Sequence, residues 1–137
     1  MGQYNSVQLR GAFTIRSCHG KYLCAHPTGQ VTGADVPRDW ERYEVDTVNG
    51  SANTIKIKGA HGQYLCVENE TRVMANRPQA AQWESFDVTV LDQSPNSFRV
   101  QLRSKNTGKF LSAQPGGNLE ANREKADAWE TFTFTRV

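Results

Sequence analysis

One pattern occurs three times along this chain and takes up nearly all of its length. Each copy has two apolar residues one position apart, a turn, the motif Gly-(Lys/Gln)-aromatic-Leu and, further along, Trp-Glu-x-aromatic. The copies run from Phe13 to Tyr43, from Ile55 to Phe86 and from Val100 to Phe132. The three tryptophans of the chain occupy the same position in each copy: Trp40, Trp83 and Trp129. A repeat of about 43 residues indicates that one supersecondary unit recurs in space.

The periodic segments alternate apolar and polar residues, as β-strands do. Ile55 and Ile57, for example, flank the polar Lys56. Turn signals separate these segments, and their glycines (Gly20, Gly62 and Gly108) can adopt the positive φ that tight hairpins require. About four short strands per repeat predict an all-β fold, a β-trefoil in which three hairpins cap a six-stranded barrel. A three-bladed propeller is the alternative, disfavoured because propellers usually have at least four blades.

The size of the chain is that of one ordinary domain. We expect a single domain over residues 1–137, with repeats at about 11–48, 53–91 and 97–137. The formal net charge of +2 is too small to indicate nucleic-acid binding. No stretch is apolar enough to span a bilayer, and the first residues lack the apolar centre of a signal peptide. Gly2 and Ser6 fit a short acylation motif, but one acyl chain binds membranes only marginally, so a membrane partner is not expected.

The three cysteines, Cys18, Cys24 and Cys66, cannot all join in disulfides within one chain. Cys24 and Cys66 are equivalent positions in the first two repeats, and Ser112 takes that place in the third. A small residue packed in a strand explains this pattern. No Cys or His spacing fits a zinc site, so we expect no metal and no cofactor. Unpaired thiols indicate a reducing, cytoplasmic compartment.

The second repeat carries the clearest form of the motif, Gly-Gln-Tyr-Leu-Cys-Val-Glu-Asn from Gly62 to Asn69, followed by Ala75-Asn76-Arg77 and Trp83-Glu84-Ser85-Phe86. In these residues the chain resembles the fascin-like β-trefoil family, of the fascin and hisactophilin type. The resemblance extends from about residue 11 to residue 137, and it implies actin binding or cross-linking. Similar modules attached to glycoside hydrolases imply carbohydrate binding instead. The chain has only three histidines, so a histidine-based pH switch is not expected.

The recurrence of the same residues in all three repeats favours structural roles for them. Exact threefold recurrence makes each Trp a packing residue rather than a sugar-stacking platform. The Glu after each Trp has an Arg a few residues earlier, and we interpret each such pair as an ion pair that ties the turn: Arg38 with Glu41, Arg77 with Glu84, Arg123 with Glu130. His19 and His61 are interpreted as solvated turn residues. No catalytic triad, phosphate loop or close pair of carboxylates is indicated, so the chain is predicted not to be an enzyme.

Positive charge gathers in the third repeat, where basic residues outnumber acidic ones from Ser97 onward. Arg103, Lys105 and Lys109 lie on a predicted hairpin tip, and Lys21 is the equivalent of Lys109 in the first repeat. A basic loop suits an acidic partner surface such as actin, because charge steers the encounter. Lys56 and Lys58, pointing away from Ile55 and Ile57, provide a further basic strand.

The sequence therefore predicts a non-enzymatic binding module. Filamentous actin is the expected partner, contacted through Arg103, Lys105, Lys109 and Lys21. The alternative is a lectin-like module that binds glycans in pockets between the hairpins, near Asn69, Glu70 and Asn76. Three similar pockets would then provide avidity from weak single sites.

Overall fold

The computed structural model describes residues 9–48, 53–68, 72–77, 84–114, 119–124 and 128–137. Within them the chain forms twelve strands, all paired antiparallel, with short 3-10 turns at Asp39–Glu41 and Ala128–Glu130. The strands are β1 (Gly11–Ser17), β2 (Tyr22–Ala25), β3 (Val31–Ala34), β4 (Arg42–Thr47), β5 (Thr54–Lys58), β6 (Tyr64–Glu68), β7 (Arg72–Arg77), β8 (Phe86–Gln93), β9 (Ser97–Ser104), β10 (Phe110–Ala113), β11 (Leu119–Arg123) and β12 (Thr131–Arg136). Each repeat supplies four of them.

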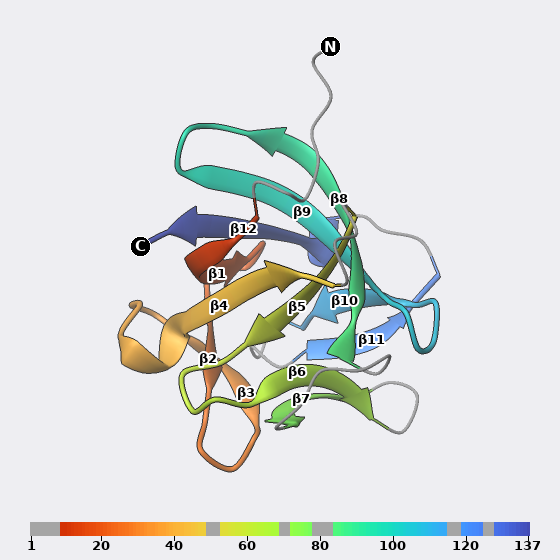
Figure 1. Cartoon of the computed structure of the whole chain (residues 1–137), viewed down its shortest axis with the longest axis horizontal. Helices are drawn as coiled ribbons and strands as arrows, with labels where there is room; N and C mark the ends of the chain where they lie inside the picture. Colours follow the sequence, from red (N-terminus) through yellow and green to blue (C-terminus); the bar gives the residue numbers. More distant parts are fainter. Residues whose placement is uncertain (1–8, 49–52, 69–71, 78–83, 115–118, 125–127) are drawn as a thin grey trace.

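Six of these strands close into a barrel. β1 pairs with β4, β4 with β5, β5 with β8, β8 with β9, β9 with β12, and β12 again with β1. The other six form the hairpins β2–β3, β6–β7 and β10–β11, which lie together in the lower half of Figure 1. A six-stranded barrel with three hairpins at one end is a β-trefoil, so the predicted fold is confirmed.

Each hairpin leaves the barrel through the same turn. Gly20, Gly62 and Gly108 stand at equivalent positions in it, with φ of 78°, 79° and 76°. A side chain is disfavoured at such φ values, which explains why all three repeats have glycine there. The expectation of positive φ at these three tips is confirmed.

The core fills the barrel with side chains from the inward positions of all three repeats. Phe13 meets Phe98 and Phe134 edge to face, with both pairs of ring centroids 5.9 Å apart. The aromatic residue of each Trp-Glu-x-aromatic motif is fully buried: Tyr43, Phe86 and Phe132. Each aromatic residue removes a large apolar area from water, which a barrel of short strands needs.

Tyr43 differs from its two equivalents by one hydroxyl group, which donates a hydrogen bond to the Leu23 carbonyl at 3.0 Å. Replacing Tyr43 by Phe removes this donor and leaves a buried carbonyl without it. We expect Tyr43→Phe to lower the free energy of unfolding by about 1–2 kcal/mol. Urea titration followed by circular dichroism would measure this. A variant as stable as the wild type would mean that the bond contributes nothing to folding.

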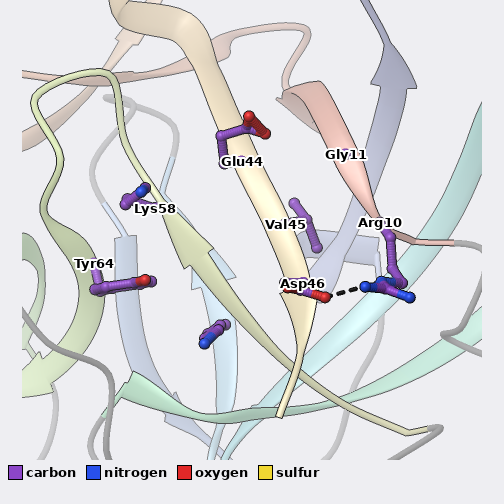
Figure 2. A pocket seen from close by; sticks show the side chains of 8 residues that line it. Arg10, Gly11, Glu44, Val45, Asp46, Lys58 and Tyr64 are labelled. Atoms are coloured by element: carbon purple, nitrogen blue, oxygen red, sulfur yellow. Dashed lines mark hydrogen bonds and ion pairs between the residues drawn. The ribbon is translucent and has the colours of Figure 1, made fainter. Parts of the chain in front are cut away.

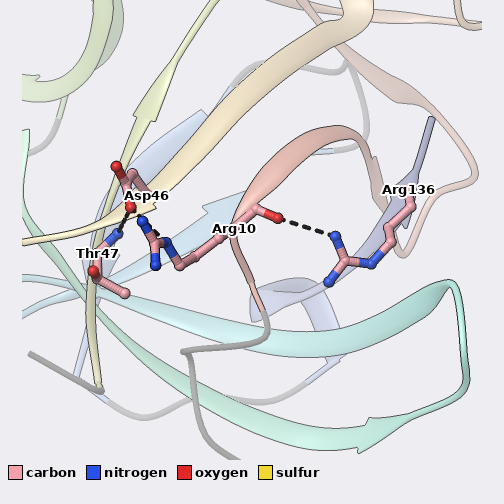
Figure 3. A network of polar contacts seen from close by, with 4 residues as sticks. All are labelled: Arg10, Asp46, Thr47 and Arg136. Atoms are coloured by element: carbon pink, nitrogen blue, oxygen red, sulfur yellow. Dashed lines mark hydrogen bonds and ion pairs between the residues drawn. The ribbon is translucent and has the colours of Figure 1, made fainter. Parts of the chain in front are cut away.

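The barrel end opposite the hairpins is covered by Arg136 from β12. Its guanidinium lies 4.9 Å from the centroid of the Phe13 ring and 5.5 Å from that of Phe98. Its Nη1 donates a hydrogen bond of 3.0 Å to the carbonyl of Arg10, as Figure 3 shows. The cation therefore stacks on the core aromatics while it fixes the residue that precedes β1.

The glutamates of the three motifs are buried, each with 4 % of its surface exposed: Glu41, Glu84 and Glu130. In the first repeat the Glu41 carboxylate accepts a hydrogen bond from the backbone N–H of Arg38, at 2.5 Å. The Glu41 N–H in turn donates to the Arg38 carbonyl, at 3.2 Å. The sequence predicted an ion pair with the Arg38 guanidinium here. The partner is the backbone instead, and a carboxylate at the start of a 3-10 turn satisfies donors that the turn leaves open.

Candidate functional site

The basic surface predicted on the third repeat is largely neutralised by acidic neighbours. Lys109 forms an ion pair with Glu124 at 3.0 Å, and its charge holds the pKa of that carboxyl below its ordinary value. Lys105 lies 3.4 Å from Asp87. In the first repeat, Lys21 pairs with Asp35. Arg103 is exposed on β9 and makes no ion pair within the described part of the chain.

Of the residues predicted for glycan binding, Asn76 alone belongs to the described part of the chain. Asn69 and Glu70 lie outside the described residues, as does Trp83. The side-chain oxygen of Asn76 accepts a hydrogen bond from the Cys66 thiol at 3.2 Å. Next to it, the Ala75 N–H donates to the Gly29 carbonyl at 2.7 Å. Asn76 therefore lies where β7 packs on the β2–β3 turn.

The turn histidines lie against tryptophans of a neighbouring repeat. The His61 ring meets Trp40 edge to face, with centroids 5.1 Å apart, and His19 meets Trp129 in the same way at 5.2 Å. His26 approaches Trp40 as well, at 5.5 Å. His61 is nevertheless exposed, as a solvated turn residue would be, whereas His19 is half-buried, so the solvated-turn interpretation is wrong for His19 alone. Trp40 and Trp129 remain 41 % and 39 % exposed, so they cover the joints between repeats without entering the core.

A groove of about 540 Å³ runs over the outer face of the first two repeats (Figure 2). Its floor and walls come from the residue before β1 and from strands β1, β4, β5 and β6. The lining residues are Arg10, Gly11, Glu44, Val45, Asp46, Lys56, Lys58 and Tyr64. Charged side chains of both signs and one aromatic ring thus share a single concave surface.

Strand alternation and register place the four central charges of this groove. On β4, Tyr43 and Val45 are buried in the core, so the residues that alternate with them, Glu44 and Asp46, point outward. On β5 the buried residues are Ile55 and Ile57, and the outward ones are Lys56 and Lys58. The register sets Glu44 opposite Lys58 and Asp46 opposite Lys56. Two acids on β4 therefore face two lysines on β5 across the exposed side of this strand pair.

Tyr64 stands beside both lysines because β6 pairs with β5 at Lys58. The Lys56 and Lys58 ammonium groups lie 5.9 and 6.0 Å from the centroid of its ring. An aromatic ring at this distance attracts a cation through its quadrupole. The ring therefore draws both ammonium groups to the same end of the groove.

Asp46, which lies opposite Lys56, is already bound. Its Oδ1 accepts hydrogen bonds from the Thr47 N–H at 2.8 Å and from the Arg10 Nε at 2.9 Å, as Figure 3 shows. The Thr47 N–H, followed by the hydrogen bond and charge of Arg10 and then the charge of Lys56, lowers the pKa of Asp46. Arg10 and Asp46 together thus contribute almost no net charge to the groove.

Lys56 and Lys58 make neither a hydrogen bond nor an ion pair with any described residue. The same is true of Glu44, which lies opposite Lys58. With Arg10 and Asp46 cancelling each other, the two ammonium groups outweigh the single Glu44 carboxylate and leave this part of the groove with a net positive charge. This part can bind an anionic group, because a concave site with two unpaired cations concentrates negative charge.

Sequence reasoning identified Lys56 and Lys58 as a basic strand but missed Arg10, Glu44, Asp46 and Tyr64. Tyr64 belongs to the repeated Gly-Gln-Tyr-Leu motif and counted there as a packing residue. The alternation of Glu44 and Asp46 with Tyr43 and Val45 was a usable signal for outward acids. Only the register of β4 on β5 shows that these acids face the lysines.

The described residues contain no group of three or more His, Cys, Asp or Glu side chains placed to hold a metal ion. Within the same residues, no helix is long and apolar enough to cross a membrane.

Comparison with known families gives a match over nearly the whole chain: the FRG1-like domain matches residues 18–136. The chain belongs to the FRG1-like domain family. FRG1-like domains are relatives of the fascin-like β-trefoils and form a family of binding modules without known catalysis. Comparison with the curated proteins finds no match. For an FRG1-like domain, an open surface groove is therefore a place to look for a partner contact.

Proposed function

We propose that this FRG1-like domain is a non-enzymatic module that attaches to actin filaments, and that its groove receives acidic side chains of the filament. The family assignment supports a binding role. The resemblance to fascin-like trefoils supports actin as the partner. The three cysteines form no disulfide, which is consistent with a reducing compartment. A cytoplasmic location is part of the same proposal.

The observation that carries this proposal is the contrast between the two basic surfaces. Lys21, Lys105 and Lys109 each have an acidic partner within the chain, which leaves Arg103 as the one predicted contact residue without an ion pair among the described residues. A filament would have to break these pairs to use them. Lys56 and Lys58 have no such partner among the described residues, so their charge is available at no such cost. We therefore move the proposed contact from the third-repeat hairpin to the groove.

Co-sedimentation with filamentous actin tests this placement. The variant Lys56→Gln/Lys58→Gln removes both groove cations, and Lys105→Gln/Lys109→Gln is the control with the same change of net charge. Two lost ion pairs at a partly exposed interface predict about tenfold weaker binding for the groove variant. The groove variant should also lose part of the salt dependence of binding. The control is expected to bind within about twofold of the wild type.

Equal weakening by both variants would mean that only overall charge matters, and the groove would lose its role. A wild-type protein that stays in the supernatant at low and high salt would end the actin proposal. Low-speed pelleting of actin would add that the domain cross-links filaments, through two sites or a dimer. The glycan alternative stays a prediction from the sequence, and Asn76, its one described residue, accepts a hydrogen bond from the Cys66 thiol.

A further inference from the structure

The two unpaired lysines of the groove have a fixed spacing. They are alternate residues on the outward face of β5, with Ile57 between them turned into the core. Alternate residues of a strand are about 6.7 Å apart along its direction. An extended partner segment has this same spacing between its own alternate residues. A carboxylate at each of two alternate positions would thus stand over each of the two lysines.

Tyr64 restricts where the tips of these side chains lie. Both ammonium groups lie about 6 Å from the centroid of its ring. Lysine stems are otherwise free to turn. With both tips drawn to one ring, the positions at which an anion contacts an ammonium group are few.

The strand geometry also determines which other side chains of the segment matter. The residue between the two carboxylates points away from the sheet, so a charge there gains no contact with the lysines. Glu44 lies directly opposite Lys58 and has no partner among the described residues. Its carboxylate repels any acidic segment that reaches Lys58 and therefore lowers the affinity of the groove for such segments.

We propose that the groove recognises an extended acidic segment of a protein partner in which two Asp or Glu residues alternate with one neutral residue. This inference rests on the proposed function for the location of the site. Lys56 and Lys58 bind the two carboxylates, Tyr64 restricts where the two ammonium groups lie, and Glu44 moderates the affinity.

The test uses two short, blocked and fluorescently labelled peptides of identical composition and charge. One carries two aspartates separated by a serine, and the other carries the same two aspartates side by side. Fluorescence anisotropy with the full chain should show about threefold to fivefold tighter binding of the alternating peptide, the effect of one additional ion pair. Lys56→Gln/Lys58→Gln should abolish this preference, and Lys105→Gln/Lys109→Gln should keep it.

Glu44→Gln adds a readout that misfolding cannot imitate, because a gain is expected. Removing the repelling carboxylate should strengthen binding of both peptides. Equal binding of the two peptides by the wild type would overturn the spacing inference, even if filament binding still depended on Lys56 and Lys58. A clear peptide preference without filament binding would support the inference and reject actin as the partner.

Discussion

Replacing Gly29 by alanine is expected to lower the free energy of unfolding by about 2–4 kcal/mol. Gly29 lies in the turn between β2 and β3 with φ of 95°, a conformation that costs an L side chain about 1 kcal/mol or more. A Cβ atom at this position would also lie 2.6 Å from the Cβ of Asn76. Neither the turn nor β7 can retreat easily, since the Gly29 carbonyl accepts the Ala75 N–H at 2.7 Å. The clash therefore adds to the backbone strain.

Two other glycines of the chain separate these causes. Gly20 and Gly62 have φ of 78° and 79°, and an added Cβ would meet nothing within 4 Å. Gly20→Ala and Gly62→Ala should thus show the backbone cost alone, about 1 kcal/mol each. Thermal unfolding of the three variants in parallel measures the difference. If Gly29→Ala costs no more than the other two, the packing of the β2–β3 turn on β7 does not constrain the fold as the distances imply.

The fold could be predicted from the sequence because the same few residues recur three times. A single Trp-Glu-x-aromatic motif is compatible with many folds. Three copies at nearly equal intervals, each with four alternating segments, require a threefold arrangement in which each copy contacts the others. The glycines at the hairpin tips followed in the same way, since one turn geometry is used three times. The burial of Tyr43, Phe86 and Phe132 follows from that symmetry as well.

The groove could not be predicted in this way because it breaks the symmetry. It combines residues of two repeats, Arg10 and the β4 acids from one and Lys56, Lys58 and Tyr64 from the next. Their proximity depends on the register of β4 on β5, which residue types alone do not specify. The partners of His19 and His61 were missed for a related reason. Each packs on the Trp of a neighbouring repeat, and a repeat viewed by itself has no such neighbour.

The charge of a basic hairpin was likewise a poor guide to an available surface. Lys105 and Lys109 stood out because the acids that neutralise them are distant or unremarkable in sequence: Asp87 lies on β8, and Glu124 follows β11. Ion pairs between strands neutralise charges that appear unpaired when only neighbouring residues in the sequence are counted. Lys56 and Lys58 have fewer basic neighbours in the sequence, yet their charges have no ion-pair partner among the described residues.

Thiol chemistry should show the largest contrast between two residues of this chain. Cys24 is buried, and burial, followed by the nearby Glu41 carboxylate, raises the pKa of its thiol to about 12. Cys18 is exposed, and burial raises its pKa by a smaller amount. Only the thiolate reacts with maleimides and disulfide reagents. At pH 8, about one Cys24 side chain in 10⁴ would be ionised, so labelling at least about 100-fold slower than at Cys18 is expected.

Single-thiol variants make this measurable. Cys18→Ser/Cys66→Ser leaves Cys24 alone, and Cys24→Ser/Cys66→Ser leaves Cys18. Serine suits positions 24 and 66 because the equivalent residue of the third repeat is Ser112, which is fully buried. A raised pKa favours the neutral thiol, so the labelling rate of Cys24 should rise about tenfold per pH unit from pH 8 to 10 without levelling off. Equal rates for the two thiols at pH 8 in the folded protein would contradict a Cys24 thiol held neutral beside the buried Glu41.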